Sequence, residues 1–171
     1  MKNQISQILK AMICYNEGDP KRVHHALKVY AFAKFIGELE GLDEGTMEIL
    51  ELASILHDIG IQNSEQKYGS SGGKYQELEG PPVAEKMLFT VGVSQKAVER
   101  VCFLVGHHHT YTEISGLDYQ ILVEADFLVN IYEDAMTKEQ AQTVLHKYFQ
   151  TETGKEYLSK MYLEPEYFPV N

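Results

Sequence analysis

The segment Leu52–Gly60 places two polar side chains inside an otherwise apolar run, and it constrains the fold more than any other part of the chain. Its apolar residues recur at helical spacing, which predicts that His57 and Asp58 lie on the last turn of a largely buried helix. Gly60 then follows as a helix stop in the left-handed conformation. Buried imidazole and carboxylate groups need a partner, and a divalent cation binds both of them. A histidine near the negative end of a helix, beside a hydrogen-bonded Asp, is the alternative interpretation.

The rest of the chain also has helical periodicity, so the sequence predicts an all-α bundle. Capping residues mark helix starts at Asp19, which precedes Pro20, and at Asp43, whereas Gly92 marks a helix end. The tail 164–171 contains two prolines and is expected to be irregular. Helices are expected over residues 5–15, 20–40, 44–58, 95–109, 118–134, 138–149 and 154–163, and a further helix is expected to end at residue 91.

The segment Ile61–Lys74 is rich in glycine and serine and is expected to form a long polar loop. The next helix is expected to begin either near Tyr75–Glu79 or after Pro82. Long loops in compact domains are often functional or mobile. Because this one directly follows His57 and Asp58, we interpret it as a lid or substrate loop, with a flexible surface excursion as the alternative.

Length and composition indicate one soluble domain, since the 171 residues are 44% hydrophobic and 23% charged. No apolar run approaches the length that crosses a bilayer, and the first residues do not resemble a signal peptide. The two cysteines, Cys14 and Cys102, lie in apolar helical patterns. We expect them to be buried free thiols in a reducing compartment, which predicts a cytoplasmic protein without a membrane partner.

The formal net charge of −10 argues against a nucleic-acid partner, because nucleic acid binds to a basic face. This charge is compatible with a small phosphorylated substrate, since bound metal ions can reverse the local field.

Four metal-binding types of side chain stand within apolar helical segments, namely His25, His57, Asp58 and Asp126. They are far apart in sequence, so three helices have to converge for them to meet, as happens in helical bundles. Two neutral imidazoles and two carboxylates also balance the charge of a divalent ion.

These residues, in this order and spacing, resemble the HD-domain metal-dependent phosphohydrolases. The resemblance covers about residues 19–134, which leaves 135–171 as a C-terminal helical extension of a single domain. It implies an all-α HD-domain bundle in which His25, His57, Asp58 and Asp126 bind a divalent ion such as Mn, Fe, Zn, Mg, Co or Ni. His24 is the rival of His25 for the first position. The motifs that carry the resemblance are His25-x3-Val29, Leu56-His57-Asp58-Ile59-Gly60 and Leu122-Val123-Glu124-Ala125-Asp126.

Many proteins of that family bind a second metal through two further histidines. His107 or His108 matches one of them, but Gln76 stands where the other is expected, four residues before Gly80. A carboxylate of Glu77 or Glu79 is the candidate replacement, with acids favoured near a helix N-terminus as the alternative. The run His107–His109 is therefore expected to supply a second metal ligand or a phosphate contact, or else simply to end a helix. One metal ion is expected, and two if this second set is complete.

The resemblance implies hydrolysis of a nucleotide or another small phosphate ester by metal-activated water. Asp58 is the expected catalytic residue, since it is placed to bind the metal and to orient the water. Arg22, Lys67 and Lys74 are candidate phosphate contacts, although exposed charges of this kind are the rule on protein surfaces. Two alternatives remain: an HD-type di-iron oxygenase or lyase, and a non-catalytic binding module that retains the fold.

Overall fold

Every segment of regular structure in residues 2–163, which the computed structural model describes, is helical. The prediction of an all-α fold is therefore confirmed. The expected irregular tail, 164–171, lies outside the described residues. In chain order, the helices are α1 (Lys2–Tyr15), α2 (Pro20–Leu39), α3 (Glu44–Leu56), α4 (Ile61–Tyr68), α5 (Gly73–Thr90), α6 (Gln95–Val105), α7 (Leu117–Glu133), α8 (Lys138–Tyr148) and α9 (Glu152–Leu158), followed by a π-helical turn (Ser159–Leu163).

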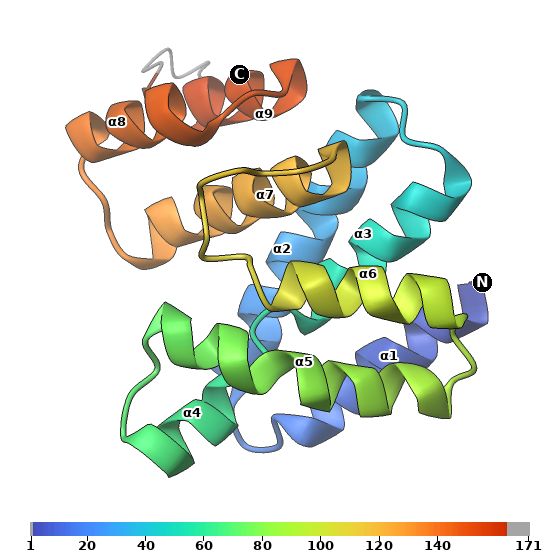
Figure 1. Ribbon diagram of the computed structural model, residues 1–171. Coiled ribbons are helices and arrows are strands. Elements are labelled where there is room, and N and C mark those ends of the chain that lie inside the picture. Colours follow the sequence, from blue (N-terminus) through green and yellow to red (C-terminus); the bar gives the residue numbers. More distant parts are fainter. Residues whose placement is uncertain (1, 164–171) are drawn as a thin grey trace, which may run out of the picture.

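Helix α7 lies between α2 and α3 on one side and the pair α8 and α9 on the other (Figure 1). It packs against α2 and α3, and α3 also packs against α6. Helix α5 lies on α6 and carries α4, while α8 and α9 cover another side of α7. This arrangement brings α2, α3, α8 and α9, which are far apart in sequence, against α7.

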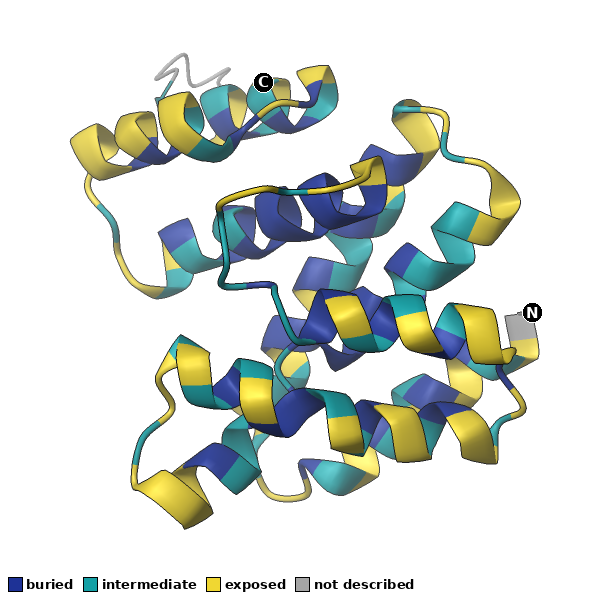
Figure 2. Ribbon diagram, in the orientation of Figure 1, coloured by how far each residue is buried: buried dark blue, intermediate teal, exposed yellow. Residues whose placement is uncertain are grey.

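Burial is concentrated in α7 and in the helix faces that surround it (Figure 2). All residues from Asp118 to Asp126 are buried, including the carboxylates of Glu124 and Asp126. A buried carboxylate is unfavourable unless hydrogen-bond donors or cations surround it. The partners of these acids therefore show which parts of the centre serve the fold and which parts serve a ligand.

The predicted helix caps are present. Pro20 is the first residue of α2, and Asp19 Oδ1 accepts a hydrogen bond of 3.1 Å from the Arg22 amide. Asp43 Oδ1 accepts from two backbone amides of α3 at 3.0 and 3.1 Å. Gly92, just after α5, has a φ of +73°, the left-handed conformation that favours glycine. Local capping chemistry thus sets these boundaries as the sequence indicated.

The expected long loop over residues 61–74 is not present, and the lid interpretation is wrong. Residues Ile61–Tyr68 form α4, which ends at Gly69 with a φ of +63°. Ser64 is buried, and its hydroxyl donates to the Gly60 carbonyl at 2.9 Å, so α4 has an inner face packed against α5. Only residues 69–72 separate the two helices. The polar composition of α4 concealed its helical character.

Helix α5 begins at Gly73, earlier than either predicted start, and continues through Pro81 and Pro82. Two prolines remove two backbone donors from the helix interior. Packing against α6 supports the helix there, where the Cys102 thiol donates to the Pro81 carbonyl at 3.6 Å. Tertiary contact thus overrides a strong local helix-breaking signal.

Gly60 has a different role from the one predicted. Its φ is −77°, so it is not a left-handed helix stop. A Cβ atom at this position would lie 2.6 Å from both the Gln76 carbonyl oxygen and the Gly80 amide nitrogen. Glycine is therefore required because the chain after Asp58 crosses the backbone of α5 in direct contact.

Both cysteines are free, as expected, but they are not both buried. Cys14 is exposed and Cys102 is half-buried. The prediction of a buried thiol is wrong for Cys14, because this residue lies on the outer side of α1 beside the exposed Ile13. Burial raises the pKa of the Cys102 thiol to about 11, which disfavours the reactive thiolate. Within residues 2–163, no helix combines the length and the apolarity needed to cross a membrane.

Candidate metal centre

Three helices bring the four predicted metal-binding side chains to one point. His25 comes from α2, His57 and Asp58 follow the end of α3, and Asp126 comes from α7. His25 Nε2 lies 3.2 Å from His57 Nε2, 3.2 Å from Asp126 Oδ1 and 3.4 Å from Asp58 Oδ2. His24, the rival candidate, is exposed. The convergence expected from the sequence is thus present in the structure.

The end of α3 allows two adjacent residues to face the same point. The helix ends at Leu56, His57 is its C-cap residue, and Asp58 lies in the turn that follows. His57 Nε2 is 3.4 Å from Asp58 Oδ2. In a regular helix, side chains of consecutive residues leave the axis about 100° apart. The turn removes this constraint, so Asp58 belongs to a turn and not to the last helical turn as predicted.

The histidines are held in one tautomer by hydrogen bonds on their outer sides. His57 Nδ1 donates to the Ser54 carbonyl at 2.8 Å, and His108 Nδ1 donates to the Val105 carbonyl at 2.8 Å. His25 Nδ1 donates to the Glu133 carboxylate at 2.9 Å. Carbonyl and carboxylate oxygens only accept, so Nδ1 carries the proton in each case. When these rings are neutral, their Nε2 lone pairs therefore point inward.

The inward arrangement needs a positive charge to be stable. His25 Nε2 and His57 Nε2 lie 3.2 Å apart, with two carboxylate oxygens beside them, and in the neutral tautomers above none of these four atoms carries a proton. Ligands at about 2.1 Å from one ion, at right angles to each other, are about 3 Å apart. The spacing and chemistry of these donor atoms therefore fit a divalent metal ion.

The electrostatics of the cluster point the same way. Burial lowers the pKa of His57, but the Asp58 charge and contact with Asp126 outweigh burial and hold the pKa well above its ordinary value. Burial raises the pKa of Asp58, but His57 and His108 outweigh it and hold the pKa well below its usual range. In the same way, the pKa of His25 is raised and that of Asp126 is lowered. These opposite shifts show a cluster that favours positive charge.

A second group of donors lies on the other side of Asp58. The Asp58 Oδ1 atom is 3.3 Å from His108 Nε2, while Oδ2 faces His25 and His57. His108 is fully buried, and its Nε2 has no hydrogen-bond partner in the part of the chain that the structure describes. Ligand atoms of Asp58, His108 and His109 all lie within 4.8 Å of one another. An unpartnered buried nitrogen beside a carboxylate is a further sign that a ligand belongs here.

Neighbouring helices fix the position of the histidine run. Glu77 Oε1 on α5 accepts hydrogen bonds from the His109 amide and the Thr110 hydroxyl, each at 3.0 Å. The Tyr119 hydroxyl lies 2.5 Å from the His107 carbonyl, and burial raises the pKa of this hydroxyl to about 12, so it remains a donor. Glu77, which the sequence offers as a candidate second ligand, therefore holds the His107–His109 run in place through hydrogen bonds to His109 and Thr110.

Gln76 occupies a place beside the second group of donors. It is buried, its Nε2 donates to the Ser71 carbonyl at 2.7 Å, and its Oε1 lies 3.2 Å from His109 Nε2. Burial lowers the pKa of His109 to about 4, so this ring is neutral and donates its Nε2 proton to Gln76. Gln76 thus ties the α4–α5 connection to the histidine run.

Several candidates from the sequence are engaged elsewhere. The Glu79 carboxylate is bonded to Lys67 Nζ at 2.5 Å and to the Tyr68 hydroxyl at 3.0 Å, so neither Glu79 nor Lys67 is brought to the cluster. His107 stacks on Phe103 and donates to the Phe103 carbonyl at 2.7 Å, which leaves His108 as the inward residue of this pair.

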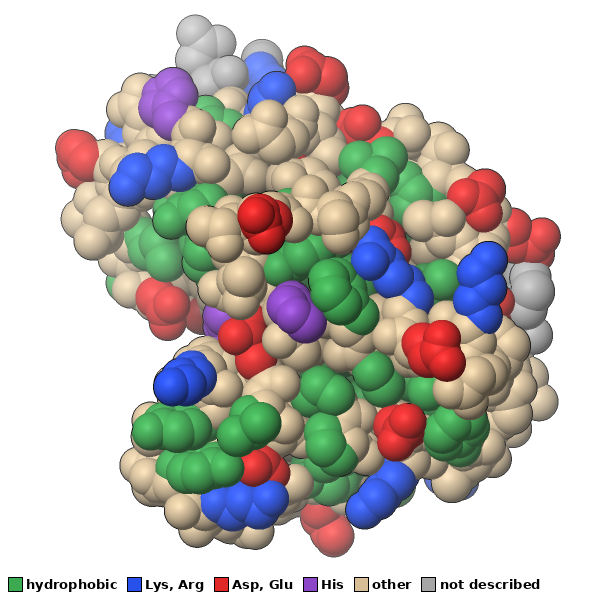
Figure 3. Space-filling view, viewed as in Figure 1, with side chains coloured by type: hydrophobic (Ala, Val, Ile, Leu, Met, Phe, Trp, Pro, Cys, Tyr) green, Lys and Arg blue, Asp and Glu red, His purple; other side chains and the backbone are tan. Residues whose placement is uncertain are grey.

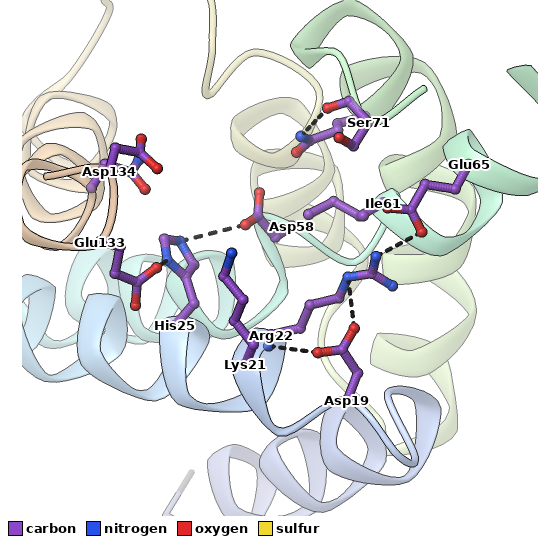
Figure 4. A pocket seen from close by; sticks show the side chains of 12 residues that line it. Asp19, Lys21, Arg22, His25, Asp58, Ile61, Glu65, Ser71, Glu133 and Asp134 are labelled. Carbon is purple, nitrogen blue, oxygen red and sulfur yellow. Dashed lines mark hydrogen bonds and ion pairs between the residues drawn. The ribbon is translucent and has the colours of Figure 1, made fainter. Parts of the chain in front are cut away.

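The cluster opens into a cavity of about 260 Å³ (Figure 4). The surface in Figure 3 is hollowed on one side, where histidine and acidic side chains gather at the edge of the hollow. Arg22 lines the cavity, but it pairs with Asp19 and Glu65, whereas Lys74 is exposed and lies outside the lining. Of the three predicted phosphate contacts, the structure therefore brings only Arg22 near the site.

Sequence reasoning missed several residues that line this cavity, among them Lys21, Asn130 and Glu133. Asn130 Nδ2 donates to Asp126 Oδ1 at 2.9 Å. All three have a helical relation to predicted ligands. Lys21 is four residues before His25, and Asn130 and Glu133 are four and seven residues after Asp126. Residues at these spacings share a helix face, so the ligand positions contained the signal that could have found them.

Comparisons with known proteins agree with this geometry. No curated protein matches the chain. The crystal structure of a predicted HD superfamily hydrolase from an uncultured Thermotogales bacterium is similar, with a TM-score of 0.63 and 25% sequence identity. The similarity covers 95% of this chain and 84% of that one. The HD domain family model matches residues 22–150. Because this match covers most of the chain, the protein belongs to the HD-domain family.

Proposed function

We propose that this protein is a metal-dependent hydrolase that cleaves small phosphate esters. The observation that carries the proposal is the convergence of His25, His57, Asp58 and Asp126 beside an open cavity. The two histidine Nε2 atoms lie 3.2 Å from each other, and each lies 3.2 to 3.6 Å from an oxygen of Asp58 and of Asp126. The similar Thermotogales protein is described as a predicted hydrolase, which supports the reaction class. A divalent ion held here would lower the pKa of bound water and polarise a phosphoryl oxygen.

The chain's own residues divide into binding and catalytic roles. His25, His57, Asp126 and Asp58 Oδ2 would hold the ion. Asp58 Oδ1 is directed away from this set, toward His108 Nε2 at 3.3 Å. The low pKa of Asp58 keeps its carboxylate ionised at neutral pH, so Oδ1 is available to accept a hydrogen bond from the attacking water and to orient it. Asp58 is therefore the proposed catalytic residue.

The cavity favours a small substrate. Its volume of about 260 Å³ lies below the usual range of about 300–1,000 Å³ for ligand pockets. Among its twelve lining residues, all within the described part of the chain, there is no Phe or Tyr that would stack on a nucleobase. A phosphate group with a small organic part fits inside. The base of a nucleotide would extend beyond the cavity.

Lys21 is the proposed phosphate contact. It lines the cavity, and in Figure 4 its side chain extends toward the space beside His25 and Asp58. The neighbouring Arg22 is already neutralised by Asp19 and Glu65 at 3.2 and 2.7 Å. Lys21 has no carboxylate partner among residues 2–163, and such a flexible ammonium is the better candidate for pairing with an incoming phosphate.

Metal analysis followed by a phosphatase screen tests the proposal. Purified protein is assayed with Mn, Mg, Co, Fe, Zn and Ni against phosphomonoesters of increasing size, including nucleoside monophosphates. We expect metal-dependent release of phosphate that Asp58→Ala abolishes. Lys21→Ala should raise KM about 10-fold, the equivalent of about 1.4 kcal/mol, with little change in kcat. Lys86→Ala, which removes an exposed lysine of α5, should leave both constants unchanged.

Two other results would direct the assignment elsewhere. Two irons per chain with uptake of O2, and no phosphate release, would indicate an HD-type oxygenase. A protein that binds no metal, and whose binding partners tolerate Asp58→Ala, would indicate a non-catalytic module. The hydrolase proposal fails in either case.

A further inference from the structure

His25 differs from the other inward histidines in the group that accepts its Nδ1 proton. His57 and His108 donate their Nδ1 protons to the backbone carbonyls of Ser54 and Val105. His25 instead donates to a side chain, with its Nδ1 2.9 Å from Glu133 Oε2. Backbone carbonyls are neutral and fixed by the helix, whereas the Glu133 carboxylate brings a negative charge. In the metal centre, the tautomer and charge of one histidine, His25, therefore depend on a side chain that is far away in sequence.

The geometry of Glu133 is built for this contact. It is the last residue of α7, two turns after Asp126, and its side chain is only 15% exposed. Its second oxygen forms an ion pair with Lys28 Nζ, from the α2 turn that follows His25. Figure 4 shows the Glu133 carboxylate directed at the His25 ring. Both helices thus contribute to the metal cluster and also to the contact that supports it from outside.

Without this carboxylate, His25 has a competing arrangement. Its Nε2 lies 3.2 Å from Asp126 Oδ1, close enough for an Nε2 proton to be donated to Asp126. In that tautomer, Nε2 has no lone pair for a metal ion, and Asp126 is occupied as well. The contact between Nδ1 and Glu133 opposes this tautomer because a carboxylate accepts only from a protonated nitrogen.

We propose that Glu133 is a positioning residue for the metal centre. It keeps the proton of His25 on Nδ1, fixes the orientation of the ring and increases its donor strength toward the cation, without binding the metal itself. The inference requires that the site binds a cation, but not that the bound form hydrolyses phosphate esters. Partners of this kind typically change metal affinity 10- to 100-fold.

Metal affinity measured without substrate tests the inference. Zinc affinity is determined by competition with a chelator for the wild type and for Glu133→Gln, which keeps the size of the side chain and removes its charge. Glu65→Gln is the matched control, because Glu65 lines the same cavity but contacts Arg22. We expect Glu133→Gln to weaken zinc binding by roughly 10- to 100-fold. The control should change it by less than about threefold, since exposed charges are screened.

Lys28→Gln separates positioning from simple stabilisation of the fold. If Glu133 acts only through its ion pair with Lys28, then Lys28→Gln and Glu133→Gln will weaken zinc binding equally, and the inference is overturned. If it acts through His25, Lys28→Gln leaves most of the affinity intact. Equal losses in Glu133→Gln and Glu65→Gln would also overturn it, because they would reveal only a general effect of charge.

Wild-type protein provides a test that does not depend on how a variant folds. In the zinc-loaded protein, nitrogen NMR of the histidine rings should show His25 protonated at Nδ1 and bound through Nε2. Binding through Nδ1, or a His25 ring without a hydrogen-bonded Nδ1 proton, would contradict the role of Glu133. A protein with no phosphatase activity but with this signature would refute the proposed function and retain the inference.

Discussion

Two buried carboxylates on α7, Glu124 and Asp126, are two residues apart and have opposite surroundings. Glu124 is surrounded by hydrogen-bond donors. One of its oxygens accepts from Gln120 Nε2 at 2.8 Å, from the Gln150 amide at 2.7 Å and from the Thr151 amide at 2.9 Å, and the other accepts from the Thr151 hydroxyl. The fold therefore satisfies Glu124 completely, and the residue ties the segment between α8 and α9 to the centre.

Asp126 is surrounded mainly by acceptors. Its one amide donor is Asn130 Nδ2, at 2.9 Å, and the inward nitrogens of His25 and His57 lie 3.2 and 3.6 Å from Oδ1. Burial raises the pKa of Glu124 and is the dominant effect there. At Asp126 the contacts with His25 and His57 outweigh burial and lower the pKa. A buried acid held by donors serves the fold, whereas one held among lone pairs indicates a cation site.

The largest effect is expected for Asp126→Asn. The amide has the same shape and still accepts from Asn130, but it removes a negative charge from the cation site. We expect metal affinity to fall at least 100-fold, about 2.7 kcal/mol, and turnover to become undetectable. The melting temperature of the metal-free protein should change by only a few degrees. A collapse of the metal-free fold would show that Asp126 is structural, and the comparison with Glu124 would then fail.

Metal addition should produce the next largest effect. An ion that binds only the folded state at 100 times its Kd stabilises it by about 2.7 kcal/mol. For a chain of this length, that corresponds to a rise in melting temperature of about 5–10 °C. Calorimetric scans with and without metal measure the shift. Glu124→Gln should show the same rise as the wild type, whereas Asp126→Asn should show little. A missing rise in the wild type would contradict a cation site in the folded protein.

Glu124→Gln should affect stability without affecting the metal. The substitution replaces one carboxylate oxygen, a hydrogen-bond acceptor, with an NH2 group, which is a donor. This donor then faces other donors, either the backbone amides of Gln150 and Thr151 or the Thr151 hydroxyl. We expect a loss of about 2 kcal/mol in the free energy of unfolding, measured by urea denaturation of the metal-free protein. Metal affinity per folded molecule should stay within about twofold of the wild type, since Glu124 does not contact the cluster. A large loss of affinity would mean that the two acids are coupled.

The sequence was sufficient for the parts of the fold that rest on local chemistry. Capping by Asp19 and Asp43 and the periodic apolar faces of the long helices are properties of neighbouring residues, and the structure has them as predicted. The convergence of His25 with Asp126 could also be anticipated, because a polar residue on an apolar helix face must point into the core.

Features that depend on contacts between distant segments could not be predicted in this way. Helix α4 has a polar sequence, and its helical character depends on α5, which no periodicity reveals. The local sequence predicts a helix stop at Gly60, whereas the close approach of Gly60 to Gly80 is a property of the tertiary structure. The pairing of Glu79 with Lys67, which removes both from the site, depends on the same packing of α4 on α5.

The smallest effect on stability, and the sharpest test of the second group of donors, is expected for Gln76→His. Among the described residues, His108 Nε2 has no hydrogen-bond partner, and the ring that could join it as a ligand, His109, is bonded to Gln76. With Asp58 Oδ1 and His108 as its free ligands, this side has too few groups to hold an ion firmly.

We expect about one metal ion per chain in the wild type and about two in Gln76→His, by elemental analysis after dialysis. Gln76→Leu, which removes the amide without supplying a ligand, should stay at one. Two ions in the wild type would show that His109 already completes the second set, and one ion in Gln76→His would show that His108 lacks a partner for a reason other than a missing ligand.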